Sequence, residues 1–120
     1  MVDITPRVKA ALDGVHPRVY YAYPQQWTTL PVISYRLEGS QEYARADNRE
    51  YLSEITYQID IWDGSPADNA DLAAAVHGAL SALGLQRQYA ADIFEAPTGL
   101  HHRTMRYGAL AGRDGRIYEY

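Results

Sequence analysis

Histidine is the residue of this sequence best suited to bind a metal ion or move a proton near neutral pH. The four histidines are His16, His77, His101 and His102. None has the His-x-x-x-His or Glu-x-x-His spacing by which one helix presents two metal ligands. His101 and His102 are adjacent, so on a strand their side chains point to opposite faces and cannot chelate one ion. His77 borders an apolar helical stripe and is interpreted as a packing residue. The sequence therefore predicts no metal site.

Two carboxylates, Asp60 and Asp63, flank Ile61-Trp62 and could act as an acid–base pair. Asp60 falls on the polar side of an alternating segment, and Asp63 precedes a glycine, so we interpret them as a solvated strand face and a turn. The 120 residues contain no cysteine, which excludes thiolate catalysis and disulfides. They also contain no Gly-x-Ser-x-Gly motif and no glycine-rich phosphate loop. The sequence thus predicts no catalytic residue and no cofactor.

One arrangement keeps a second hypothesis open. Arg103 and Arg106 lie close to His102 in sequence and could bind an anion if they converged in a concave pocket. The chain would then be a small α+β enzyme or ligand-binding module. Outward-facing strands often carry arginine without any such role.

The clearest structural element is a strand over residues 51–62, where apolar and polar side chains alternate. Its apolar face carries Tyr51, Ile55, Tyr57, Ile59 and Ile61, and its polar face carries Glu54, Thr56, Gln58 and Asp60. Such alternation predicts that one face is buried while the other meets water or a partner protein.

A long amphipathic helix is predicted to follow. Ser65 can cap it, Pro66 suits its first turn, and Asp68 complements its positive end. The core stripe is Leu72, Val76, Leu80 and Leu83, and Gly84 ends the helix. The opposite side carries small residues, which either reflect helix propensity or admit another backbone.

The remaining elements are a short first helix and several strands. Thr5 can cap the helix, Pro6 starts it and Gly14 can end it. Strands are predicted over residues 19–23, 30–38, 85–95 and 100–110, the last two joined as a hairpin through Pro97-Thr98-Gly99. The fold class is therefore α+β: a mainly antiparallel sheet of about five strands, with one long amphipathic helix packed on it and a short N-terminal helix.

We expect a single domain over residues 1–120, with two less regular parts. Residues 39–50 are polar around Tyr43 and should form a long loop or arm, which is unusually long for a hairpin link. Residues 111–120 should form a C-terminal tail with a short edge strand at its end.

Charge and composition restrict the partners. The net charge of −4 argues against sequence-specific nucleic-acid binding and against an anionic membrane surface. It also counts against a third hypothesis, a regulatory or antitoxin-like oligomer with a basic DNA-binding patch. No apolar run approaches a membrane span, and the N-terminus lacks the apolar stretch of a signal peptide, so synthesis in the cytoplasm is expected. The eleven tyrosines against one phenylalanine suit either strands or protein interfaces.

The order of several segments resembles a known family. They are Ile55-Thr56-Tyr57-Gln58-Ile59-Asp60-Ile61-Trp62, Leu80-Ser81-Ala82-Leu83-Gly84-Leu85, Asp92-Ile93-Phe94-Glu95, Thr98-Gly99-Leu100-His101-His102-Arg103 and Met105-Arg106-Tyr107. Over residues 30–110 the chain resembles the small tail-completion or tail-terminator proteins of long-tailed double-stranded DNA phages and related prophages.

The resemblance implies a non-enzymatic virion protein of the tail. Such a protein forms a ring, as a homohexamer, that caps the tail tube, stops its growth and joins the tail to the head connector. Its partners would be itself, the tail tube protein and a connector or neck protein, and phage DNA can pass through the ring. A head–tail joining protein of the neck is the alternative. The candidate residues for a subunit or tube interface are Glu42, Tyr43, Arg45, Arg49, Thr56, Gln58, Arg103 and Arg106.

Overall fold

The computed structural model describes residues 3–46, 49–64 and 66–118, without the side chains of residues 44–46, 49–51 and 66–68. The elements within these ranges are, in chain order, α1 (Thr5–Asp13), β1 (Val19–Tyr21), β2 (Val32–Ala46), β3 (Arg49–Asp63), α2 (Pro66–Leu83), β4 (Gln86–Glu95), β5 (Leu100–Gly112) and β6 (Ile117–Tyr118). Both predicted helices and the β4–β5 hairpin are confirmed.

The strands form one mixed sheet in the order β1-β2-β3-β5-β4, with β6 paired to the end of β5. All pairings are antiparallel except β1 with β2, because residues 22–31 carry the chain back to the end of the sheet where β1 began. The predicted α+β class with a mainly antiparallel sheet is confirmed, and the described strands number six.

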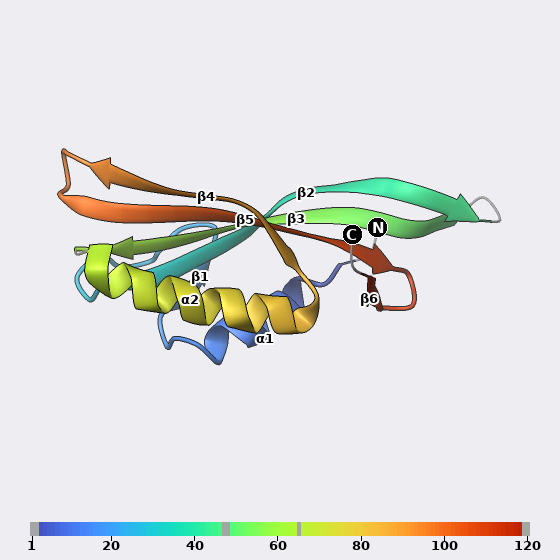
Figure 1. Ribbon diagram of the computed structural model, residues 1–120, viewed down its shortest axis with the longest axis horizontal. Coiled ribbons are helices and arrows are strands. Elements are labelled where there is room, and N and C mark those ends of the chain that lie inside the picture. The colour runs from blue at the N-terminus through green and yellow to red at the C-terminus, as the bar shows by residue number, and fades with distance from the viewer. Residues whose placement is uncertain (1–2, 47–48, 65, 119–120) are drawn as a thin grey trace.

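Both helices cover the same face of the sheet, so the opposite face carries no helix (Figure 1). The apolar side chains of β3 point to the covered face, where Ile59 and Ile61 are buried with Val76 and Leu80 of α2. Leu83 packs at the margin of this core. The face assignment made from the alternation of β3 is therefore confirmed for Ile55, Tyr57, Ile59 and Ile61, while the side chain of Tyr51 lies outside the described ones.

Hydrogen bonds from two buried tyrosines attach the helices to the sheet. The Tyr57 hydroxyl bonds to Thr5 Oγ1 of α1 at 2.8 Å, and the Tyr107 hydroxyl bonds to His77 Nδ1 of α2 at 2.9 Å. His77 is half-buried, as its interpretation as a packing residue requires. Each tyrosine fills the core with its ring and satisfies its hydroxyl at the helix.

Among the predicted helix ends, Gly14 after α1 and Gly84 after α2 are confirmed, and the cap at Thr5 is wrong. Gly84 ends α2 with φ +99°, and the Leu85 and Gly84 amides donate to Leu80 O and Ser81 O, the bonds of a Schellman motif. Thr5 does not cap α1, because its hydroxyl is engaged by Tyr57; Asp3 Oδ1 accepts from the Thr5 amide at 2.9 Å instead. The predicted cap Ser65 lies outside the described residues.

Over its described residues, 39–46 and 49–50, the segment predicted as a long loop or arm is strand and not loop. β2 and β3 continue through it as a paired ribbon, from Gly39 opposite Thr56 to Ala46 opposite Arg49, with register shifts around Glu38 and Tyr43. β5 pairs with β3 only as far as Leu52, so the end of this ribbon projects beyond the sheet (Figure 1). We call residues 39–46 and 49–50 the arm.

The C-terminal residues turn back onto the sheet. β5 runs to Gly112, and Ile117 and Tyr118 pair with Ala111 and Leu110 as a short edge strand, while 119–120 lie outside the described residues. The Arg7 side chain donates to Gly115 O at 2.6 Å and attaches this turn to α1.

Candidate interaction surfaces

The face of the sheet opposite the helices, here called the open face, brings three of the predicted interface residues together. Thr56 and Gln58 lie on β3, and Arg106 lies directly opposite Gln58 on β5. Cross-strand polar contacts cover this face: Arg36 Nη2 donates to Gln58 Oε1 at 2.7 Å, and Arg106 Nε lies 3.0 Å from the Glu38 carboxylate. These groups hold each other in place across three strands.

Asp60 lies on the open face but is not solvated, which corrects the prediction. Only 5% of Asp60 is exposed. Its carboxylate accepts hydrogen bonds from Gln58 Nε2 at 3.1 and 3.2 Å and from His102 Nε2 at 2.7 Å. Asp63 is buried as well, with one oxygen accepting from the Gly64 amide at 2.7 Å, as in a turn. The two carboxylates point to different surroundings and form no acid–base pair.

Aromatic rings extend this cluster to the end of the sheet. The His102 ring stacks on Trp62 with 3.7 Å between centroids, and Trp27 meets Trp62 edge to face at 5.1 Å. The Trp62 indole donates to Ser34 Oγ at 3.0 Å. Beside these rings lies a groove of about 450 Å³, here called the aromatic groove, lined by Tyr23, Trp27, Trp62, Glu95, Thr98 and Leu100. Sequence reasoning missed it, because Trp27 comes from an irregular segment far from β3.

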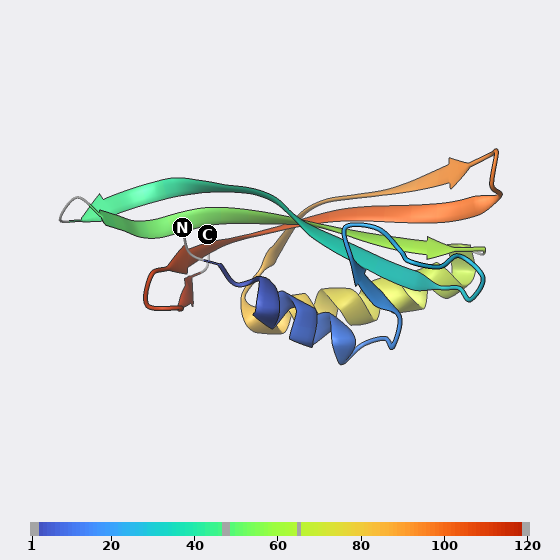
Figure 2. The ribbon, with the colours of Figure 1, turned by 180° about the vertical axis from the view of Figure 1, so that it is seen from behind.

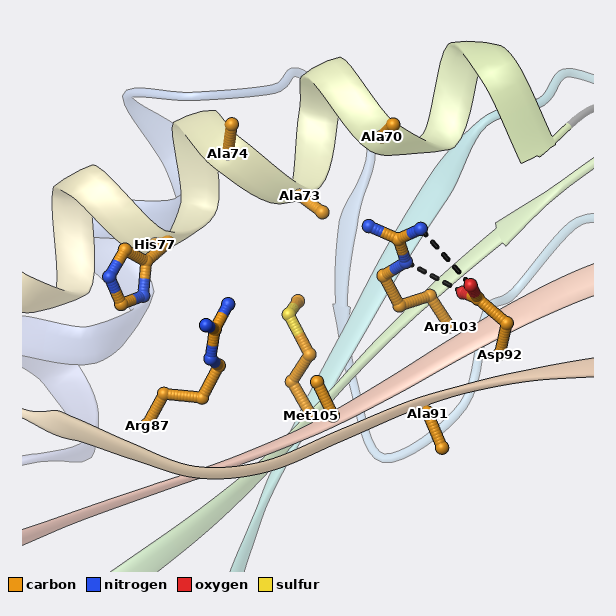
Figure 3. Close-up of a pocket in the computed structure, with 10 residues that line it drawn as sticks. Ala70, Ala73, Ala74, His77, Arg87, Ala91, Asp92, Arg103 and Met105 are labelled. Atoms are coloured by element: carbon orange, nitrogen blue, oxygen red, sulfur yellow. Dashed lines mark hydrogen bonds and ion pairs between the residues drawn. The ribbon is translucent and has the colours of Figure 1, made fainter.

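Arg103 lies on the helix-covered side, away from Arg106 and His102. Its guanidinium binds Asp92 through two hydrogen bonds of 2.7 and 3.2 Å, under α2 (Figure 3). A pocket of about 340 Å³ separates α2 from β4 there, with alanines, His77, Arg87 and Met105 along its walls. Arg103 faces Asp92, Arg106 faces Glu38, and His102 lies between Asp60 and Glu95, with 3.4 Å from its Nδ1 to Glu95 Oε1, so the three side chains do not converge. The anion pocket of the second hypothesis is therefore wrong.

The arm places the other predicted interface residues at the opposite end of the sheet. Glu42 lies opposite Ser53, and Tyr43 follows at a register shift with 58% of its surface exposed. Arg45 and Arg49 pair through their backbones with Glu50 and Ala46, and their side chains lie outside the described ones.

The shifted pKa values belong to core tyrosines and to charged groups on or next to α1, where the hydrogen bond to Asp13 raises the pKa of Lys9. Burial raises the pKa of Tyr57 to about 12 and raises the pKa of Tyr35 and Tyr107 as well. The hydrogen bonds from Thr5 lower the pKa of Asp3. Tyrosines with raised pKa values stay protonated at neutral pH and serve packing and hydrogen bonding.

Two features are absent from the described residues. No group of three or more His, Asp or Glu side chains is placed to hold a metal ion. Over the same residues, no helix has the length and apolarity needed to cross a membrane.

The chemically distinctive groups of this fold lie on surfaces suited to protein contacts. These surfaces are the polar open face of the sheet, the projecting arm and the aromatic groove. Residues 4–112 match the family model of tail completion protein gp17, and the chain belongs to that family. It is a non-enzymatic structural protein of the phage tail with a role in tail completion, as the resemblance implied. No curated protein matches the chain significantly.

Proposed function

We propose that this tail completion protein forms a homo-oligomeric ring on the end of the tail tube, terminates tube growth and joins the tail to the head connector. Six subunits is the number that the family resemblance implies. The arm and the open face are the proposed contact surfaces, between subunits and toward the tube.

The observation that carries the proposal is the projecting arm. The chain extends 52 × 25 × 23 Å, with a radius of gyration of 15.3 Å, against roughly 14 Å for a compact domain of this length. A two-stranded ribbon is at best marginally stable alone in water. An arm that leaves the sheet therefore gains most if a neighbouring subunit or the tube covers it. Glu42, Tyr43, Arg45 and Arg49 are the residues proposed to make that contact.

The open face supports a second contact. Gln58 and Arg106 present an amide and a guanidinium that intramolecular contacts already hold in place, and Thr56 adds a hydroxyl on the same face. Preorganised polar groups lose little side-chain entropy when a partner binds. Arg103 is proposed to reach a partner only at the pocket between α2 and β4, where Asp92 already holds it.

The edge strand β4 favours a head-to-tail assembly. β4 is an edge strand, with Tyr89, Ile93 and Phe94 exposed along it. An exposed apolar edge is prone to bind another chain. The arm and this edge are different surfaces, and a contact between different surfaces is head-to-tail, which produces a ring when the rotation closes.

Mass photometry and negative-stain electron microscopy of the purified chain test the proposal. We expect a concentration-dependent ring that binds one end of purified tail tubes and stops their further growth. A stable monomer at high concentration, together with no ring of this protein in virions, would overturn it. A ring found on the connector and absent from separated, complete tails would instead support the head–tail neck protein.

A further inference from the structure

The two ends of the molecule differ in chemistry. The arm projects at one end of the long axis, and the turn of the β4–β5 hairpin, which carries Thr98, lies at the other (Figures 1 and 2). The arm end is mainly polar. The hairpin end contains the aromatic groove, whose walls are two indoles, a phenol ring and a leucine.

On the basis of the proposed ring, we infer that adjacent copies join end to end, with Tyr43 on the arm of one copy docked in the aromatic groove of the next. Within residues 36–43 and 52–56, Tyr43 is the only large apolar side chain that is exposed. A register shift in the ribbon sets it apart from the regular cross-strand pairs. An exposed aromatic ring on a polar arm is a typical anchor for a pocket on a partner.

The groove matches a tyrosine in size and polarity. Its volume of about 450 Å³ can hold one aromatic side chain with room for neighbouring backbone. Apolar walls suit the ring, and edge-to-face contacts with Trp27 or Trp62 would add to its burial. At the rim, the Glu95 carboxylate, 37% exposed, can accept a hydrogen bond from the phenol hydroxyl of Tyr43.

One local charge pair accompanies the docked tyrosine. The groove lining contains one ionisable carboxylate, Glu95, and no arginine or lysine. Arg45 lies two residues after Tyr43 in the sequence and can pair with Glu95 of the next copy, while the arm as a whole, with Glu42, Asp47 and Glu50 against Arg45 and Arg49, is not positive. The fit of the tyrosine ring therefore carries the contact, and charge adds one local ion pair.

The contact is head-to-tail, because the arm and the groove are different surfaces at opposite ends. Repeated around a rotation axis, the same contact adds one subunit after another until the ring closes. Assembly then stops, because no free arm or groove remains. Pairing of two arms or of two grooves would stop at a dimer.

Photo-crosslinking from position 43 tests the contact directly. p-Benzoylphenylalanine keeps an aromatic ring at that position, and illumination of the assembled protein should join it to peptides containing Trp27, Trp62 or Thr98. The two sites lie at opposite ends of a molecule 52 Å long, so such a product must join two copies. The control carries the same photo-crosslinker at Ala75, an exposed position of α2 that the proposed contacts do not use, and it should not reach the groove.

Intrinsic fluorescence gives a second readout. The chain has two tryptophans, and both line the aromatic groove. Assembly of the wild type should shift tryptophan emission to the blue as the groove becomes dry. Tyr43→Ala should raise the subunit concentration needed for assembly at least about tenfold, whereas Tyr43→Phe, which keeps the ring, should change it much less.

The outcomes separate this inference from the proposed function. Rings that crosslink from position 43 to another surface, with unchanged tryptophan emission, would overturn the inference and leave the ring intact. Crosslinking from position 43 to the tail tube protein would mean that Tyr43 docks on the tube and not on a second copy of this chain. That result would also overturn the inference. Absence of any ring would overturn both.

Discussion

The imidazole of His102 lies flat against the indole of Trp62, with 3.7 Å between the ring centroids and 13° between the planes. The same imidazole donates from Nε2 to Asp60, two residues before Trp62 on β3. One side chain of β5 therefore satisfies a buried carboxylate and supports a wall of the aromatic groove. The stability of the sheet and the shape of the groove depend on the same residue.

His102→Ala should lower the free energy of unfolding by about 2–4 kcal/mol. The substitution removes the stacking partner of Trp62 and leaves the buried Asp60 carboxylate with Gln58 as its remaining side-chain donor among the described residues. Chemical denaturation measures the change, and tryptophan emission of the folded variant should shift to the red as Trp62 loses its cover.

The matched control is His101→Ala, one residue earlier on the other face of β5. His101 makes a tilted ring contact with Phe94, which is itself exposed. We expect this variant to lose less than about 1 kcal/mol. Equal losses of unfolding free energy in the two variants would show that the hydrogen bond to Asp60 and the stacking on Trp62 add no stability of their own.

A second comparison tests the two faces of the sheet. Leu80 of α2 has no exposed surface, so Leu80→Ala should cost about 2–5 kcal/mol through lost burial and a cavity. Thr56 lies half-buried on the open face, and Thr56→Ala should cost less than about 1 kcal/mol in an isolated subunit. Thermal melts in the reverse order would mean that the register of β3 is misassigned by one residue.

The elements set by local pattern could be predicted from the sequence. Alternation along β3 fixes which side chains are buried, because a slip of one residue would turn every isoleucine outward. Gly84 ends α2 as expected because it adopts a positive φ that other residues avoid.

The surroundings of individual polar groups could not be predicted in the same way. Asp60 is buried because His102 and Trp62 close over it, and these contacts join β5 to β3 across the sheet. The arm residues have low strand propensity, yet the pairing of β2 with β3 extends through them. One error was avoidable: Arg103 and Arg106 are an odd number of residues apart on one strand, so they had to face opposite sides.

Alkaline pH should destabilise the fold through Tyr57. Its pKa is about 12 in the folded chain and about 10 when exposed, so the unfolded state loses its proton first. This contribution to stability is complete below pH 10 and is lost as the pH rises through 12, by roughly 2–3 kcal/mol. Melting temperatures from pH 8 to 11.5 should fall more steeply for the wild type than for Tyr57→Phe, with the exposed Tyr43→Phe as control. Parallel curves for all three would contradict the burial argument.

Shortening the arm should leave the fold intact and prevent assembly. Glu42 and Ser53 are directly opposite, so an Asn-Gly turn can replace residues 43–52 and keep the pairing of β3 with β5 from Ser53 opposite Ala111 onward. The deleted part pairs with β5 only at Leu52, and none of the buried core residues is removed. The melting temperature should therefore change by no more than a few degrees, while ring formation and tail joining are lost.

A full-length arm with Arg45→Ala and Arg49→Ala is the matched control for that deletion. If the arginines supply charge and Tyr43 supplies the anchor, this variant should assemble more slowly and with less salt sensitivity than the wild type, but it should still form rings. Mass photometry across salt concentrations measures ring formation, and complementation of a phage lacking the gene measures tail joining. Infectious particles built with normal yield from the shortened chain would show that the arm is only a connector between β2 and β3.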